Sequence, residues 1–180
     1  YTYATDDPVI RTGFSHFRAN FLREKFISYE LFAQIQFDLG RGLQFRQLGG
    51  GDVKLRLSEK RSEDFTAFLG VGGMWEQETW KFPASDMEKT LALVKSSNFL
   101  SLAGNINQST TAESTVYFQT GYDDSVEAFR HRVNVHAALV FGLTNVLSFE
   151  VEGSFSYENR PVVPILRYMF FFQNGIKFNF

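Results

Sequence analysis

The stretch that decides the fold is Tyr168-Met169-Phe170-Phe171-Phe172-Gln173-Asn174-Gly175-Ile176-Lys177-Phe178-Asn179-Phe180. Alternate residues of this stretch are apolar apart from Asn174, and they are Tyr168, Phe170, Phe172, Ile176, Phe178 and Phe180. The intervening positions include Gln173, Lys177 and Asn179. A period of two residues is typical of a β-strand. Frayed soluble termini are usually polar, whereas an apolar, aromatic last strand is expected where terminal strands close a transmembrane β-barrel.

The same alternation recurs along the rest of the sequence and predicts about nine complete strands in one up-and-down meander. They are expected at residues 11–22, 29–38, 43–57, 65–78, 96–107, 113–122, 129–141, 147–157 and 168–180. The tail of a further strand is expected at residues 1–4. The longest connection, 79–95, is predicted to contain a short helix, because Ser85, Asp86 and Glu88 suit a helix N-terminus.

The composition narrows the functional classes. A length of 180 residues suits a single domain, and we assign residues 1–180 to one β-barrel domain. The formal net charge of −2 gives no basic excess, so nucleic acid is not an expected partner. No cysteine is present, which excludes disulfides and thiolate metal sites. The glycine-rich stretches at 49–51 and 70–73 lie inside predicted strands, so a phosphate-binding loop is not expected. We also expect no cofactor and no metal.

Aromatic residues at the ends of the apolar faces indicate contact with a membrane. Tyr29 and Phe37 bracket aliphatic residues on one predicted strand, and Phe65 and Trp75 do so on another. Aromatic girdles flank the lipid-facing band of transmembrane barrels in this way. The predicted membrane girdle comprises Tyr29, Phe37, Phe65, Trp75, Phe141, Tyr168, Phe170, Phe178 and Phe180.

The opposite, polar faces carry charges of both signs and are predicted to face the lumen. The predicted lumen charge network comprises Arg46, Lys54, Arg56, Arg130, Arg132, His136, Glu150, Glu152 and Lys177. His136 is expected roughly opposite Glu152 across the turn at 142–145, where a lumen hydrogen bond is its expected role. A charge at the bilayer midplane would cost about 2–4 kcal/mol. The sequence therefore predicts an all-β, transmembrane, up-and-down antiparallel β-barrel, with a soluble lipocalin-like barrel, apolar inside, as the alternative.

Loop lengths predict an orientation for this barrel. If the final strand ends in the periplasm, the longer loops at 79–95, 121–128 and 159–165 lie together on the outer side, as outer-membrane barrels prefer. If strand directions alternate back from the final strand, residues 1–4 are the end of a strand that runs from the periplasm to the outer side and whose beginning is not in the sequence. Bacterial single-chain barrels usually have an even number of strands. We therefore expect the chain to lack at least one N-terminal strand, unless another polypeptide completes the barrel.

Four stretches of the sequence resemble a known family. They are Ser15-His16-Phe17-Arg18, Glu30-Leu31-Phe32-Ala33-Gln34-Ile35-Gln36-Phe37-Asp38, Leu43-Gln44-Phe45-Arg46-Gln47-Leu48-Gly49-Gly50-Gly51 and Ser96-Ser97-Asn98-Phe99-Leu100-Ser101-Leu102. These are similar to patterns of the uncharacterised, so-called salt-induced outer-membrane β-barrel proteins. The resemblance implies a barrel of about twelve strands, so we expect about 10–12 strands in the full protein. It implies no reaction and no catalytic residue.

We expect an integral protein of the outer membrane of a Gram-negative bacterium, in contact with outer-membrane lipid. Its expected partners are the barrel assembly machinery, through the C-terminal strand, and other outer-membrane proteins. The expected role is a structural or accessory subunit, or a narrow pore filled by side chains, without enzymatic activity. One alternative is a barrel-embedded lipid or lipid A hydrolase, for which Ser96, Asn98 and His131 near the outer rim are the candidates. The other is a soluble lipocalin-like barrel that binds a ligand.

Overall fold

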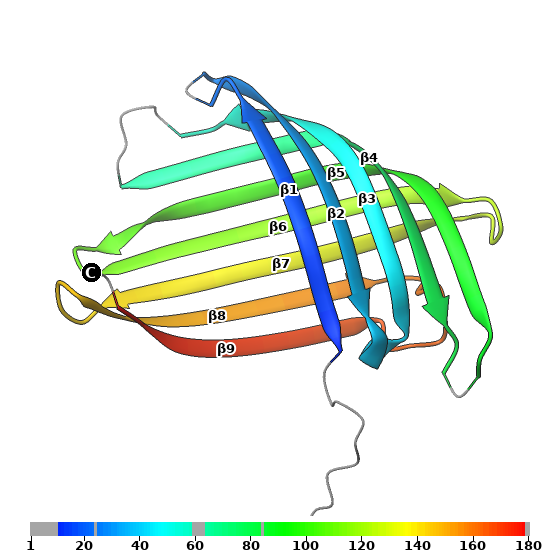
Figure 1. The fold of residues 1–180 in the computed structure, drawn as a ribbon. Coiled ribbons are helices and arrows are strands. Elements are labelled where there is room, and N and C mark those ends of the chain that lie inside the picture. Colours follow the sequence, from blue (N-terminus) through cyan, green and yellow to red (C-terminus); the bar gives the residue numbers. More distant parts are fainter. Residues whose placement is uncertain (1–10, 24, 59–63, 84, 179–180) are drawn as a thin grey trace, which may run out of the picture.

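The computed structural model describes residues 11–23, 25–58, 64–83 and 85–178. Within them lie β1 (Thr12–Phe21), β2 (Ile27–Asp38), the 3₁₀ helix η1 (Leu39–Arg41), β3 (Leu43–Arg56), β4 (Phe65–Lys81), β5 (Glu88–Asn107), β6 (Thr110–Asp123), β7 (Ala128–Gly142), β8 (Leu147–Glu158) and β9 (Tyr168–Phe178). These nine described strands form one sheet in which each strand pairs antiparallel with its neighbours in sequence. Figure 1 shows this sheet curled into a half-barrel. The predicted all-β, up-and-down arrangement is confirmed.

The alternating sequence places polar side chains inside the curl and apolar side chains outside. On β2, Glu30 is 2% exposed, whereas its neighbours Tyr29 and Leu31 are 49% and 54% exposed. On β4, Glu76 is 2% exposed and Trp75 is 44% exposed. Successive side chains of a strand point to opposite faces, so the buried charged residues share the inner face, together with a few apolar side chains such as Met74 and Phe99. A barrel with an apolar interior would show the reverse order.

The connection between β4 and β5 is shorter than the sequence predicts. β4 continues to Lys81 and β5 begins at Glu88, and these two residues face each other at the end of an unbroken ladder. The turn between them, 82–87, is held by a hydrogen bond of 3.1 Å from the Met87 N–H to the Ser85 hydroxyl. The helix predicted here is wrong, because cross-strand pairing takes the backbone groups that a helix would need, and Ser85 serves a tight turn instead.

Helical structure in the described part of the chain is confined to η1, and no described helix is long and apolar enough to cross a membrane. At the start of η1, the Asp38 carboxylate accepts a hydrogen bond of 3.3 Å from the Arg41 N–H. At its end, Gly42 adopts a φ of 87°, and a Cβ there would lie 2.8 Å from the carbonyl oxygen of Lys81. Both the left-handed backbone and the close approach require glycine at this turn.

β1 and β9 are the two edges of the described sheet, and they do not pair with each other. Because every neighbouring pair is antiparallel, the first and ninth strands run in the same direction. Side chains on both faces of β9 are exposed, as Phe171 and Phe172 illustrate at 56% each. The described residues therefore form an open, curled sheet. The strand tail predicted at 1–4 and the girdle residue Phe180 lie outside the described residues.

Candidate functional site in the lumen

Strand register lines up inward-facing residues from neighbouring strands in one row across the inside of the curl. From β2 to β8 this row consists of Glu30, Asp52, Gly72, Ser97, Gln119, Arg132 and Glu158. Two further inward-facing carboxylates, Glu76 and Glu78, follow Gly72 along β4 at the same period of two. The register thereby gathers ionisable groups inside the curl.

Arg132 on β7 is the centre of a buried group of ion pairs. Its Nη1 lies 2.9 Å from Glu76 Oε2, and its Nη2 lies 2.6 Å from Glu78 Oε1. The same guanidinium also pairs with Glu158. Arg132 is 8% exposed, and Glu76 and Glu78 are 2% exposed. The planar, multidentate guanidinium suits several carboxylates at once, which compensates for removing these charges from water.

Arg46 and Lys95 complete the group from β3 and β5. Arg46 Nε lies 3.2 Å from Glu78 Oε1, and the Arg46 guanidinium also pairs with Glu76. Lys95 pairs with Glu76 as well. We name the resulting set the charge cluster, with the cations Arg46, Lys95 and Arg132 and the anions Glu76, Glu78 and Glu158. Its three cations balance its three anions, so the charge cluster carries no net formal charge.

The connection between β8 and β9, residues 159–167, is tied down by Arg130. Arg130 Nε lies 2.6 Å from Asp123 Oδ2, and the guanidinium also donates to the carbonyl oxygen of Arg160. The side-chain amide of Asn159 donates to the carbonyl oxygen of Phe129 at 3.1 Å. These contacts hold the loop against β7.

The anchored loop forms a small apolar cluster at the end of β3 and β4. This apolar plug consists of Leu43, Trp80, Val162 and Val163, with Phe82, Leu91 and Ile165 packed against it. The Trp80 indole N–H donates to Glu78 Oε2 at 3.1 Å, which links the plug to the charge cluster. Apolar contacts and ion pairs therefore fill the same end of the curl.

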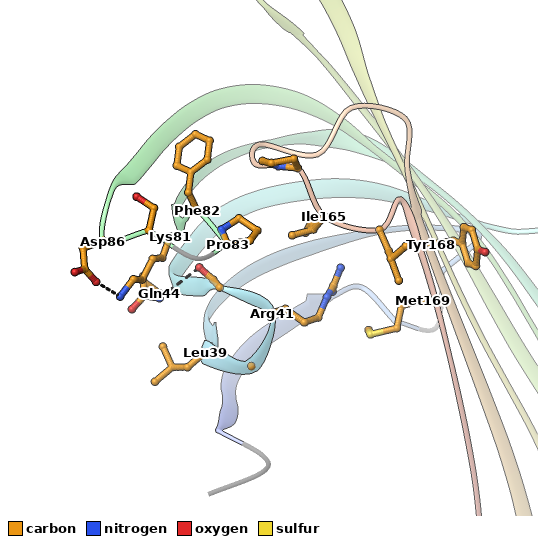
Figure 2. A pocket seen from close by; sticks show the side chains of 15 residues that line it. Leu39, Arg41, Gln44, Lys81, Phe82, Pro83, Asp86, Ile165, Tyr168 and Met169 are labelled. Carbon is orange, nitrogen blue, oxygen red and sulfur yellow. Dashed lines mark hydrogen bonds and ion pairs between the residues drawn. The ribbon is translucent and has the colours of Figure 1, made fainter. Parts of the chain in front are cut away.

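A rim cavity of about 1020 Å³ opens beside the plug. Figure 2 shows its walls, which come from η1, the turn at 82–87, the 159–167 loop and the start of β9. At its edge, Lys81 Nζ lies 2.6 Å from Asp86 Oδ1. This hydrogen bond and the nearby ammonium charge hold the pKa of the Asp86 carboxyl below its usual range.

A second cavity, the lumen cavity, has a volume of about 630 Å³. Its polar wall includes the row residues Glu30, Asp52, Ser97 and Gln119. Arg18 from β1 crosses this space: its Nη2 donates to the Tyr117 hydroxyl on β6 at 3.2 Å, and its Nε lies 3.2 Å from Glu30 Oε1. The edge strand is therefore joined to the opposite wall through the cavity.

The predicted lumen network is only partly one network. Arg46 and Arg132 belong to the charge cluster. Lys54 and Arg56 instead lie over the ring of Phe68, with Lys54 Nζ 4.2 Å and Arg56 Cζ 4.7 Å from its centroid. Cations are attracted to the negative face of an aromatic ring, so the Phe68 ring helps to accommodate both, and the Glu30 carboxylate also attracts Lys54.

His136 was expected roughly opposite Glu152, and the register places the two residues one same-face pair apart: His136 faces Ser154, and Glu152 faces Ala138. Glu152 accepts a hydrogen bond from the side chain of Gln173 on β9.

The remaining predicted network residues lie apart from the charge cluster. Arg130 pairs with Asp123 and holds the 159–167 loop. Glu150 on β8 faces Gly175, and Lys177 is on β9, so both are on the last two strands before the open edge. The structure thus places the nine predicted charges in several separate environments.

Sequence reasoning placed Glu76 and Glu78 on the polar face but left them out of the lumen charge network, and it missed Lys95 and Glu158. The prediction ended one strand near Glu78 and put Lys95 in a loop, whereas both residues lie in the paired part of β4 and β5. The signal was the alternation itself, which continues through Trp80. The predicted strand 65–78 already placed Glu76 and Glu78 on the polar face, and extending the following strand back from 96 would have added Lys95.

Most predicted girdle residues that the structure describes are exposed on the outer face. Their exposed fractions run from 42% to 68%, for Tyr29, Phe37, Phe65, Trp75, Tyr168, Phe170 and Phe178. Phe141 is half-buried and stacks on Phe149 with 6.4 Å between ring centroids. These rings form an aromatic, outward-facing surface.

The candidate hydrolase residues are not brought together. Ser96 faces Thr120, and Thr120 faces His131, so the serine and the histidine lie two strands apart. At about 4.8 Å per strand, this is too far for a hydrogen bond between nucleophile and base. Asn98 donates to Ser96 Oγ at 3.1 Å, and the His131 ring stacks on Phe118 at 5.8 Å.

The fold defines a class, a curled antiparallel all-β half-barrel with a charged interior and an apolar exterior. Comparisons of the chain with protein-family models, curated proteins and solved structures give no match. The outer-membrane family suggested by the motifs at 30–38 and 43–51 therefore stays a prediction.

Proposed function

We propose that this chain is an integral outer-membrane β-barrel protein with a plugged lumen, acting as a structural or accessory component of that membrane. The observation that carries the proposal is that apolar side chains are exposed on the outer face of the sheet while charged side chains are buried on the inner face, the reverse of a water-soluble barrel. The outward-facing Leu31, Val71 and Ile176 are 54%, 50% and 63% exposed. The inward-facing Glu30 and Asp52 are 2% and 5% exposed.

Water is a poor solvent for this outer face. Burying one large aliphatic or aromatic side chain is favourable by about 1.5–3 kcal/mol, and the exposed apolar residues of nine strands forgo that gain in water. Hydrocarbon removes the penalty, whereas a charge on the lipid side at midplane would cost about 2–4 kcal/mol. A bilayer around the sheet accounts for both faces at once.

The filled interior favours a structural or accessory role over a general pore. The charge cluster packs guanidinium, ammonium and carboxylate groups against one another, and Val163 in the apolar plug is 2% exposed. Small barrels are filled by their own side chains. The lumen cavity of about 630 Å³ is a chamber beside this filling.

The two tryptophans provide a direct test of the membrane placement. Trp75 faces outward at 44% exposure, and Trp80, five residues further along the same strand, faces inward at 3%. Single-tryptophan variants, Trp80→Phe and Trp75→Phe, are reconstituted into vesicles that contain phospholipids brominated on their acyl chains. Strong quenching of Trp75 with weak quenching of Trp80 is expected.

Circular dichroism with retained strand content serves as the folding control for both variants. Quenching of Trp75 by aqueous acrylamide, with no effect of brominated lipid, would contradict the membrane placement and favour a soluble barrel. Equal quenching of both tryptophans by lipid would contradict the assignment of inner and outer faces.

A further inference from the structure

The rim cavity combines an apolar wall with a positive charge. Two cations line it, Arg41 and Lys81, and Lys81 Nζ is already paired with Asp86 at 2.6 Å. Among the described residues, no carboxylate forms an ion pair with the Arg41 guanidinium. In the part of its wall that the structure describes, the cavity therefore offers one unpaired positive charge beside apolar surface. The apolar lining includes Leu39, Phe82, Ile165, Tyr168 and Met169.

The backbone of η1 holds Arg41 in place. The Arg41 N–H donates to the Asp38 carboxylate at 3.3 Å, and the Gly42 N–H donates to the Leu39 carbonyl oxygen at 3.1 Å. The Lys81 N–H donates to the Gly42 carbonyl oxygen at 2.8 Å, which ties η1 to the end of β4. Figure 2 shows the Arg41 side chain reaching from η1 toward the start of β9. A ligand of Arg41 therefore does not have to order the backbone that carries the charge.

A carboxylate is the anion that matches this charge. The guanidinium of Arg41 is a planar fork of N–H donors, and such a fork pairs with a carboxylate through two parallel hydrogen bonds. A carboxylate carries one negative charge, which one guanidinium balances. A phosphate monoester carries a charge of about −1.5 to −2 at pH 7. Its second charge would need Lys81, and Asp86 already holds that ammonium group.

We propose that the rim cavity binds a fatty-acid anion, with the carboxylate on Arg41 and the alkyl chain along the apolar wall. Tyr168 and Met169 in this wall are 63% and 41% exposed, and an alkyl chain over them would remove apolar surface from water. The cavity volume of about 1020 Å³ lies at the upper end of the range of about 300–1,000 Å³ for small-molecule pockets. This inference goes beyond a structural role and rests on the geometry of the rim alone, so it stands or falls separately from the membrane placement.

Equilibrium dialysis of the folded chain in dodecyl maltoside micelles tests this site, with protein-free micelles as the reference for partitioning. The probes are octanoate, butyrate, octanol, octylammonium and octyl phosphate. Octanoate is expected to bind, and octyl phosphate is expected to bind no more tightly. Butyrate, octanol and octylammonium are each expected to bind at least about tenfold more weakly, because each lacks either the chain or the negative charge. No binding of octanoate, equal binding of octanol or tighter binding of octyl phosphate would overturn the proposal.

Matched variants locate the carboxylate. Arg41→Gln is expected to weaken octanoate binding about tenfold or more and to leave octanol binding unchanged, because only the contact between charges is lost.

Arg11→Gln makes the same chemical change beside η1, where the Arg11 carbonyl oxygen accepts a hydrogen bond from the Leu39 N–H. Arg11 does not line the cavity, so both affinities are expected to stay at the wild-type values. Met169→Gln puts an amide into the apolar wall and is expected to weaken the binding of both octanoate and octanol. Wild-type affinity for octanoate in Arg41→Gln would overturn the assignment. The circular dichroism spectrum of each variant establishes that it is folded.

Discussion

Arg132 on β7 and Glu78 on β4 meet at 2.6 Å although 54 residues separate them in sequence. Two strands, β5 and β6, lie between theirs in the sheet, so this contact spans the inside of the curl and does not follow the ladder. Side chains therefore hold the curvature as well as fill the interior.

Replacing Arg132 with methionine tests that role. The change is expected to lower the free energy of unfolding by about 3–5 kcal/mol, because Glu76 and Glu78 stay buried without their shared counter-charge. Urea titration in micelles, followed by circular dichroism, measures the loss. Arg56→Met is the control, since Arg56 lies over the Phe68 ring and outside the charge cluster, and about 1 kcal/mol or less is expected. Equal losses of unfolding free energy in the two variants would show that the charge cluster does not contribute more to stability than the contact of Arg56 with Phe68.

Gly72 tests the close approach of β3 and β4. A Cβ at this position would lie 2.1 Å from the carbonyl oxygen of Gly51 and 2.2 Å from Asp52 Oδ1. Gly72→Ala is therefore expected to cost about 1–3 kcal/mol of stability through forced backbone movement. Gly153→Ala is the control, because among the described residues no heavy atom apart from its chain neighbours lies within 4 Å of a Cβ there, and it is expected to be neutral or slightly stabilising. A neutral Gly72→Ala would contradict the tight packing.

The apolar plug is expected to govern ion passage. Wild-type protein in planar bilayers should show no large, stable conductance. The double change Val162→Ala and Val163→Ala removes packing from residues that are 8% and 2% exposed, so the loop loosens and brief conducting events should become more frequent. Leu166→Ala, on the same loop at 75% exposure, should behave as wild type. Large conductance in the unaltered protein would contradict a plugged lumen.

The ion pair at the rim predicts a pH effect. Lys81 lowers the pKa of Asp86, so the pair contributes stability above the unfolded-state pKa of Asp86 and loses it as pH falls through the lower, folded-state pKa. Asp86 is fully exposed, and solvent screening makes the contribution small. Lys81→Met should raise the pKa of Asp86 toward its usual value in a carbon-13 NMR titration. Lys89→Met should leave it unchanged, and an equal rise in both variants would contradict the pairing.

The sequence was sufficient for the strands and for their faces, because the period of two is a local property. Tyr29, Glu30 and Leu31 already separate exterior from interior. The ion-pair partners inside the curl could not be predicted from the sequence. Until the curvature and register are known, Arg132 could pair with Glu150 or Glu158 as readily as with Glu78. The helix predicted near Ser85 failed for a related reason: a local capping preference was outweighed by pairing along β4 and β5.

The common direction of β1 and β9 has a geometric consequence. If these two edge strands paired directly, they would form a parallel pair in an otherwise antiparallel sheet. A single extended peptide laid between them could instead run opposite to both and hydrogen-bond along its left and right sides simultaneously. The gap between β1 and β9 can therefore be closed with antiparallel pairing throughout only by an odd number of added strands, whatever their side chains are.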